Sequence, residues 1–167
     1  MNNHEDTEAQ RKRLNDLSYR VIGLSMEVHR ELGPGLLESV YEEALAYELA
    51  QAGIHFERQR ECPVRYKDVL LPCNYRLDFV VEGELILELK AVTELLPLHH
   101  AQLLTYLKLE RRTLGLLINF NVPVLKDGLR RVARGELFNP EPKPASAIRH
   151  LAGLLCAFVP LWLNPNP

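Results

Sequence analysis

The chain has 167 residues, of which 47% are hydrophobic and 25% are charged, and its formal net charge is −2. These values are typical of one globular domain with appendages and exclude a strongly basic protein, although a local basic patch remains compatible with them. No apolar run reaches the roughly 18–20 residues of a membrane span, and the polar N-terminus does not resemble a signal peptide. Cys62, Cys73 and Cys156 lack zinc-ligand spacing. We therefore expect a cytoplasmic protein with reduced thiols and no membrane partner.

Hydrophobic periodicity, interrupted by Gly and Pro, predicts the elements of the domain. The predicted helices cover residues 17–32, 37–52, 98–111 and 125–135, behind a frayed polar lead-in over residues 1–14. The predicted strands cover residues 55–60, 62–66, 75–81, 85–92 and 113–120. One crossover through a helix joins the last two strands. This order favours an α/β or α+β layer with a central mixed sheet flanked by helices.

The composition divides the chain into four parts. A polar lead-in (1–14) precedes the main domain (15–138), which a Pro-rich linker (139–146) separates from an apolar C-terminal tail (147–167). In the tail, Ile148, Leu151, Leu155 and Phe158 roughly follow one helical face. The tail is too short and interrupted for a membrane span. We expect it to pack on the core or to form a homo-oligomer.

Three charges stand in the apolar hairpin of residues 75–92: Asp78, Glu88 and Lys90. Glu88 and Lys90 are two residues apart and project from one face of a strand. A loop centred on residues 82–84 puts Asp78 opposite Glu88, whereas a two-residue turn pairs Asp78 with Leu87. A shared site therefore requires an odd-length loop or a bulge, for which Gly83 is suited.

Two converging carboxylates repel each other unless a cation lies between them, and oxygen ligands suit Mg²⁺ or Mn²⁺ better than zinc. A neighbouring lysine can help to activate an attacking water or stabilise a phosphorane-like transition state. Asp78 with Glu88-x-Lys90 therefore favours phosphodiester hydrolysis. A structural ion pair is the alternative for these three residues taken alone.

Two helices carry further candidates. Gln102 and Tyr106 are four residues apart and share a face of the helix that follows the Glu88 strand. Glu38 and Tyr41 lie one turn apart at the start of the second helix. The alternatives are a solvated glutamine with a core tyrosine, and an acidic residue that is favourable near a helix N-terminus.

Three motifs, in this order, resemble those of one family: Gly35-x-x-Glu38-x-x-Tyr41, Asp78 with Glu88-x-Lys90, and Gln102-x-x-x-Tyr106. The first resembles the signature of the small bacterial GxxExxY proteins of the PD-(D/E)XK nuclease superfamily. The second resembles the metal and catalytic core of that superfamily, and the third resembles the QxxxY motif of its RecB-like and Cas4-like branch. The resemblance runs from about residue 17 to residue 132.

The resemblance implies a restriction-endonuclease-like αβββαβ core and a Mg²⁺-dependent nuclease that acts on DNA. It implies that Asp78, Glu88 and the Leu89 carbonyl ligate the metal, and that Glu38 does so directly or through water. Lys90 is then expected to position or activate the water. The implied catalytic set is Glu38, Asp78, Glu88, Lys90, Gln102 and Tyr106, with the last two orienting the site or contacting DNA phosphate. The alternative is a non-catalytic nucleic-acid- or protein-binding module that retains the fold.

Basic residues outside the motifs are candidates for contacts with nucleic-acid phosphate. They are Arg111, Arg112, Arg130, Arg131 and Arg134, and a solvated surface is their alternative interpretation. His99-His100 departs from the His-acidic pair expected in relatives, and a solvated helix start is the favoured interpretation there. The sequence contains no recognised base-reading module.

Overall fold

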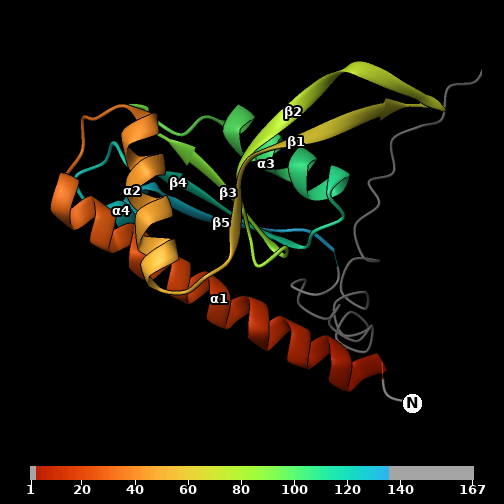
Figure 1. The fold of residues 1–167 in the computed structure, drawn as a ribbon, viewed down its shortest axis with the longest axis horizontal. Coiled ribbons are helices and arrows are strands. Elements are labelled where there is room, and N and C mark those ends of the chain that lie inside the picture. Colours follow the sequence, from red (N-terminus) through yellow and green to blue (C-terminus); the bar gives the residue numbers. More distant parts are fainter. Residues whose placement is uncertain (1–2, 136–167) are drawn as a thin grey trace, which may run out of the picture.

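The computed structural model describes residues 3–135, which form one mixed sheet covered by helices on both faces (Figure 1). The strand order in the sheet is β1-β2-β3-β4-β5. β3 and β4 are parallel and are joined through α3, and every other neighbouring pair is antiparallel. The elements are α1 (Asn3–Leu32), α2 (Glu38–Gln51), β1 (Phe56–Tyr66), β2 (Val69–Val81), β3 (Leu85–Lys90), α3 (Pro97–Leu109), β4 (Leu114–Asn119), α4 (Leu125–Gly128) and β5 (Leu129–Ala133). The predicted α/β sheet and its crossover are confirmed.

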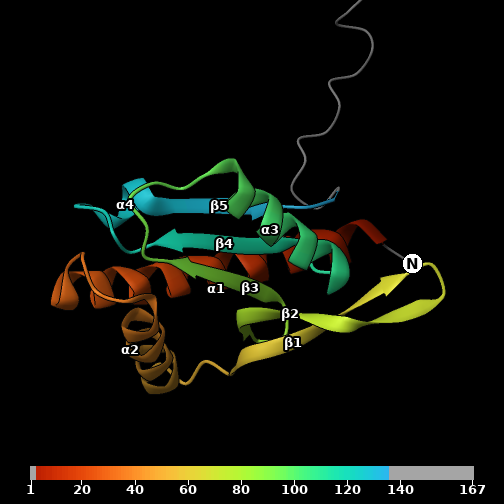
Figure 2. The same ribbon diagram turned by 90° about the horizontal axis from the view of Figure 1, so that it is seen from above.

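The two faces of the sheet carry separate apolar clusters. α1 and α2 cover one face and α3 covers the other, with α1 and α3 on opposite sides of the strands (Figure 2). Leu87 and Leu89 of β3 belong to the α1–α2 cluster, whereas Ile86 belongs to the α3 cluster. Because side chains alternate along a strand, Glu88 lies on the α3 face. Burial on both faces explains the continuous apolar runs of β3 and β4.

The frayed lead-in expected over residues 1–14 is wrong for residues 3–14, which form the first turns of α1. Leu14 is buried in the α1–α2 cluster, and Arg13 forms an ion pair with Glu84 of the β2–β3 loop. These tertiary contacts stabilise a polar helical segment whose own sequence gives a weak signal. The two short strands expected over residues 55–66 are likewise one strand, β1.

The helix expected over residues 125–135 is also wrong beyond its first turn. Only Leu125–Gly128 is helical, and Leu129–Ala133 forms β5. β5 pairs antiparallel with β4, with Val132 opposite Gly115. This pairing satisfies backbone groups along the outer edge of a buried strand, and it places Val132 under α3.

β1 and β2 extend well past the other strands as a two-stranded hairpin (Figure 1). β2 pairs with β3 only through residues 79–81, and beyond that point β1 is its sole neighbouring strand among residues 3–135. We call residues 60–77 the arm. It ends in a two-residue turn, since Tyr66 pairs with Val69.

Several sequence predictions concern parts of the chain outside residues 3–135: the linker (139–146), the tail (147–167) and Cys156. Within the described residues, no helix combines the length and the apolar character that crossing a membrane requires. Cys62 is a buried free thiol.

Candidate functional site

The β2–β3 loop has the odd length that a shared carboxylate site requires. Val81 pairs with Leu85, so residues 82–84 form a three-residue loop in which Glu82 and Gly83 have φ values of 49° and 64°. The same register, continued toward the site, sets Asp78 opposite Glu88. The predicted odd length of the loop is therefore confirmed.

The regular alternation of β2 breaks at Asp78. Phe79 packs in the α1–α2 cluster and Leu77 packs in the α3 cluster, although two residues at that spacing share a face in a regular strand. Gln59, which stands opposite Asp78 in β1, has a φ of 49°. At this break the Asp78 carboxylate turns toward β3, where its Oδ2 accepts a hydrogen bond of 2.8 Å from the Leu89 N–H.

Glu88 is a buried carboxylate with one oxygen engaged. It is 2% exposed, and its Oε1 accepts a hydrogen bond of 2.6 Å from Lys90 Nζ. Its Oε2 is buried and has no hydrogen-bond partner within the described part of the chain. Burial, reinforced by the negative charge of Asp78, raises the pKa of Glu88 to about 7, although the hydrogen bond from Lys90 opposes this shift.

Asp78 and Lys90 share the same electrostatic environment. Burial raises the pKa of Asp78 to about 6, against the opposing effects of the Leu89 N–H and of the Lys90 charge. Burial disfavours the charged form of Lys90, but the hydrogen bond and charge of Glu88 outweigh it, so the pKa of Lys90 is raised. The structure therefore brings together all three charges of the predicted core.

Gln102 and Tyr106 lie together on α3, as their spacing predicts. Gln102 Nε2 donates a hydrogen bond of 2.5 Å to Tyr106 Oη, and the tyrosine ring is buried. Burial is the main reason that the pKa of Tyr106 is raised, and the charges of Glu88 and Asp78 raise it further. The Gln102–Tyr106 pair therefore lies on the face of the sheet that bears Glu88.

Glu38 is the first residue of α2, and its side chain is exposed. Burial is the main cause of the raised pKa values of Asp78 and Glu88, and the negative charge of Glu38 raises both slightly further. Glu38 is not hydrogen-bonded to either carboxylate in the described structure, and the predicted direct contact with a metal stays a prediction.

Tyr41 has a structural role that the sequence left unassigned. Its hydroxyl donates to the Gly33 carbonyl (2.7 Å) and accepts from the Leu36 N–H (3.1 Å). Its ring stacks on Phe120, with ring centroids 4.6 Å apart. Tyr41 therefore fixes the loop that delivers Glu38.

The donor set fits a magnesium ion that keeps several of its waters. Among the described residues, the side-chain oxygens at hand are Glu88 Oε2, which has no hydrogen-bond partner there, and the carboxylate of Asp78. Because the N–H and C=O of a strand residue point to the same neighbour, the Leu89 carbonyl also faces Asp78. Within residues 3–135, no three His, Cys, Asp or Glu side chains are grouped so as to hold a metal. Mg²⁺ is commonly held by one or two carboxylates with waters, so two carboxylates are sufficient.

Asn119 is a positioning residue that the sequence analysis missed. It is buried at the end of β4 and is paired with Lys90 in the β3–β4 register. Its side chain accepts hydrogen bonds from the N–H groups of Val92 (3.0 Å) and Asn121 (3.2 Å), and donates to the Val92 carbonyl (2.8 Å). It therefore holds the segment that follows Lys90. A lone polar residue in an apolar strand was the available signal.

Three of the five candidate phosphate-binding arginines lie at the end of the sheet away from Lys90, whereas Arg130 is level with Glu88, two strands across the sheet. Arg111 and Arg112 lie just before β4, whose first residue pairs with Leu85. Leu85 is at the far end of β3, about 17 Å from Lys90. The Arg134 N–H donates to the Thr113 carbonyl at this same distant end.

The two central β5 arginines are held locally. Arg130 donates to the backbone carbonyls of Asp127 and Leu129, and Arg131 donates to Asn15 of α1. At the start of α3, His99 Nδ1 accepts a hydrogen bond from the Leu96 N–H (3.1 Å), and His100 is exposed.

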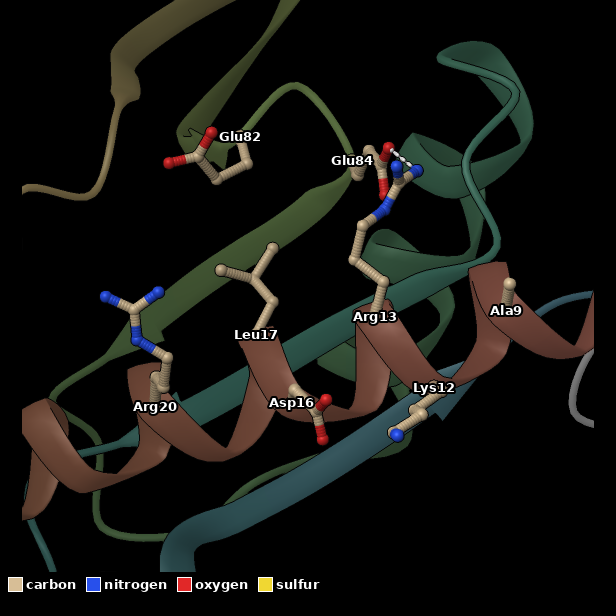
Figure 3. A pocket seen from close by; sticks show the side chains of 8 residues that line it. All are labelled: Ala9, Lys12, Arg13, Asp16, Leu17, Arg20, Glu82 and Glu84. Atoms are coloured by element: carbon tan, nitrogen blue, oxygen red, sulfur yellow. Dashed lines mark hydrogen bonds and ion pairs between the residues drawn. The ribbon is translucent and has the colours of Figure 1, made fainter.

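A cavity of about 640 Å³ lies between α1 and the β2–β3 loop (Figure 3). Its lining is Ala9, Lys12, Arg13, Asp16, Leu17, Arg20, Glu82 and Glu84, and it contains none of the predicted site residues. Arg13 points toward Glu84, with which it forms an ion pair (Figure 3). The three basic and three acidic side chains of its lining give the cavity no net charge, so it favours neither an anionic nor a cationic ligand. We therefore place the chemistry at the buried carboxylates.

The αβββαβ order from α2 to β4, with carboxylates where β2 and β3 separate, defines a nuclease-like α/β protein. A model of the PD-(D/E)XK nuclease superfamily matches residues 15–132. The chain therefore belongs to that superfamily, and its fold is restriction-endonuclease-like. Membership indicates nuclease activity and nucleic-acid binding. Neither the curated proteins nor the solved structures contain a match.

Proposed function

We propose that the protein is a Mg²⁺- or Mn²⁺-dependent nuclease that hydrolyses DNA phosphodiester bonds with a metal-activated water. The observation that carries the proposal is the buried, unpartnered Oε2 of Glu88 beside the Asp78 carboxylate. Asp78, Glu88 and the Leu89 carbonyl would hold the ion. When bound, such an ion lowers the pKa of water and stabilises charge on a phosphoryl group.

The other residues of the site have complementary roles in this proposal. Lys90 holds Glu88 through one hydrogen bond and provides a positive charge for the attacking water or the phosphate. Glu38 would hold the ion directly or through water. Gln102 orients Tyr106, and this pair contacts the substrate phosphate or orients the site.

The finer family assignments belong to this proposal as well. The Gly35-x-x-Glu38-x-x-Tyr41 motif supports membership of the GxxExxY proteins, since Tyr41 supports the loop that bears Glu38. The hydrogen bond between Gln102 and Tyr106 supports the QxxxY branch. A cytoplasmic location fits the free, buried Cys62.

The test is cleavage of linear, nicked and single-stranded DNA by the purified chain in Mg²⁺, Mn²⁺ or EDTA. We expect metal-dependent cleavage that Glu88→Gln and Lys90→Ala each reduce roughly 100-fold or more, because each removes a charged group that acts on the reacting phosphate. Lys126→Ala, at an exposed lysine of α4, is the matched control. Cleavage that survives both EDTA and Lys90→Ala contradicts the proposal, as does inactivity on every DNA and RNA.

A non-catalytic nucleic-acid- or protein-binding module is the second candidate. It is favoured by the absence, within the described residues, of a third metal-binding side chain grouped with Asp78 and Glu88. Tight DNA binding without metal, unchanged by Glu88→Gln and without cleavage, would favour this module over the enzyme.

A further inference from the structure

The arm (residues 60–77) leaves the sheet beside the candidate site. Its base is fastened to α3: the ring of Tyr75 packs edge-on against Tyr106 at 5.4 Å, and Arg60 forms an ion pair of 3.0 Å with Glu110. Beyond this base, every residue from Arg65 to Leu70 is exposed. The arm therefore joins a fixed base at the carboxylates to a projecting tip (Figure 1).

Aromatic rings mark both ends of the arm. Tyr75 is 41% exposed beside the buried Tyr106, and Tyr66 is 61% exposed at the tip. Cys62 pairs with Tyr75, so the two exposed rings are separated by four residues of β1, or about 13 Å. A two-stranded hairpin with exposed rings at both ends is suited to contact an extended partner.

The cations of the arm divide into two groups. Arg60, near the base, is paired with Glu57 and Glu110. Within the described residues, Arg65 and Arg76 have no hydrogen bond or ion pair, and Lys67 lies over the Tyr66 ring at 5.4 Å. The arm carries a net charge of +2 in a chain whose net charge is −2. Because neighbouring residues of a strand alternate between its faces, Arg76 and Tyr75 project from opposite faces of the arm. Cations without a partner among the described residues, together with exposed rings on the same hairpin, match the chemistry of an unpaired nucleic-acid strand, which offers phosphates and base faces.

We propose that the arm holds an unpaired nucleic-acid strand, with bases on Tyr75 and Tyr66 and phosphates on Arg65, Lys67 and Arg76. The strand runs from the tip toward the carboxylates, since Tyr75 touches Tyr106. Val69 and Leu70 are also exposed at the tip, but an apolar protein partner would leave the unpaired cations unexplained. This inference rests on the proposed nuclease function and names the class of its substrate.

The experiment is fluorescence anisotropy with a labelled oligothymidylate, in EDTA, with Glu88→Gln as the parent so that no cleavage occurs. Tyr66→Ala and Tyr75→Ala should each weaken binding roughly 5- to 150-fold, the range for the loss of one stacked base. Tyr75→Phe keeps the ring and should bind as the parent does. Arg76→Gln should lower the slope of log K against log[salt] by about 0.7, as expected for one phosphate contact on a single strand.

Tyr19→Ala, at an exposed tyrosine of α1, is the control and should bind as the parent does. The proposal is overturned if the parent does not bind the oligonucleotide, or if natively folded Tyr66→Ala and Tyr75→Ala bind it unchanged. It is also overturned if Tyr75→Phe loses as much affinity for the oligonucleotide as Tyr75→Ala does, or if a duplex binds as tightly as the single strand.

A second measurement separates this proposal from the nuclease proposal. Hydrolysis of bis(p-nitrophenyl) phosphate by the wild-type chain measures the carboxylate site alone, because this small ester does not reach the tip. If the wild-type chain hydrolyses the ester but Tyr66→Ala binds the oligonucleotide as the parent does, the proposed role of the arm is wrong and the nuclease proposal stands. If the arm substitutions weaken oligonucleotide binding but the wild-type chain hydrolyses no substrate, the nuclease proposal is wrong and the proposed role of the arm stands.

Discussion

Glu88→Gln should stabilise the metal-free protein in mild alkali and abolish its stabilisation by metal. Glu88 is 2% exposed, has one unpartnered oxygen and faces the charge of Asp78. Its ionised form is therefore costly in the folded protein when no cation is bound. Glutamine keeps an acceptor for Lys90 Nζ and removes the negative charge.

The pKa of Glu88 gives the magnitude and the sign. Burial raises it from an ordinary 4.5 to about 7, and one pKa unit is worth about 1.4 kcal/mol, so the effect is at most about 4 kcal/mol. A raised folded-state pKa gives a stabilisation that is complete below 4.5 and is lost as the pH rises through about 7. The wild-type free energy of unfolding should therefore fall between about pH 5 and about pH 8, and fall less in Glu88→Gln.

Urea unfolding in EDTA at these two pH values measures the difference. Glu94→Gln, at an exposed glutamate with no partner in the described residues, is the control and should follow the wild type. Addition of Mn²⁺ at about 100 times its Kd should stabilise the wild type by about 2.7 kcal/mol, but not Glu88→Gln. If the free energies of unfolding of the wild type and of Glu88→Gln fall by the same amount between these pH values, ionised Glu88 does not destabilise the folded protein, and the prediction is wrong.

Four further substitutions, one of them a control, test the local structure by urea unfolding. Tyr41→Phe removes a hydroxyl with two hydrogen bonds and should cost about 1–2 kcal/mol; an unchanged stability would show that this loop contact is unimportant. Gly128→Ala places a Cβ against the Asn119 carbonyl and should destabilise by about 1–3 kcal/mol. Gly23→Ala, the control, meets open space within α1 and should stabilise by about 0.5–1 kcal/mol. Gln59→Gly relieves a φ of 49° and should stabilise by up to about 1 kcal/mol, so a loss of stability would contradict strain there.

The sequence predicts those elements whose signal is local. Residues 17–32 and 37–52 carry helical periodicity with glycine stops, and the observed α2 covers Glu38–Gln51. The apolar runs before Lys90 and before Phe120 are strands buried on both faces. The three-residue β2–β3 loop also follows from local chemistry, since Gly83 accepts a positive φ at no steric cost.

Pairing between distant segments decides the elements that the sequence misassigns. Leu129–Ala133 has one fully buried side chain, Val132, and a pattern that a helix accommodates equally well. The segment is a strand because it pairs with the edge of β4 that faces away from β3. That edge is available in the sheet only because the crossover through α3 sets β4 beside β3. The first turns of α1 likewise depend on Arg13 reaching Glu84, a contact across 71 residues of sequence.

The position of Asp78 is the feature that sequence rules describe least well. Strict alternation predicts that the Asp78 side chain points to the same face as Glu88. In the structure the alternation of β2 reverses at Asp78, next to the positive φ of Gln59 in β1, and the carboxylate accepts a hydrogen bond from the Leu89 N–H of β3. Glutamine has no local preference for this conformation, so tertiary contacts must impose it. On one side Arg58 is held by Glu42 and Glu43, and on the other Leu77 is buried under α3. The two clusters therefore hold β2 in opposite orientations on either side of Asp78, and the carboxylate turns toward Leu89 where these orientations meet.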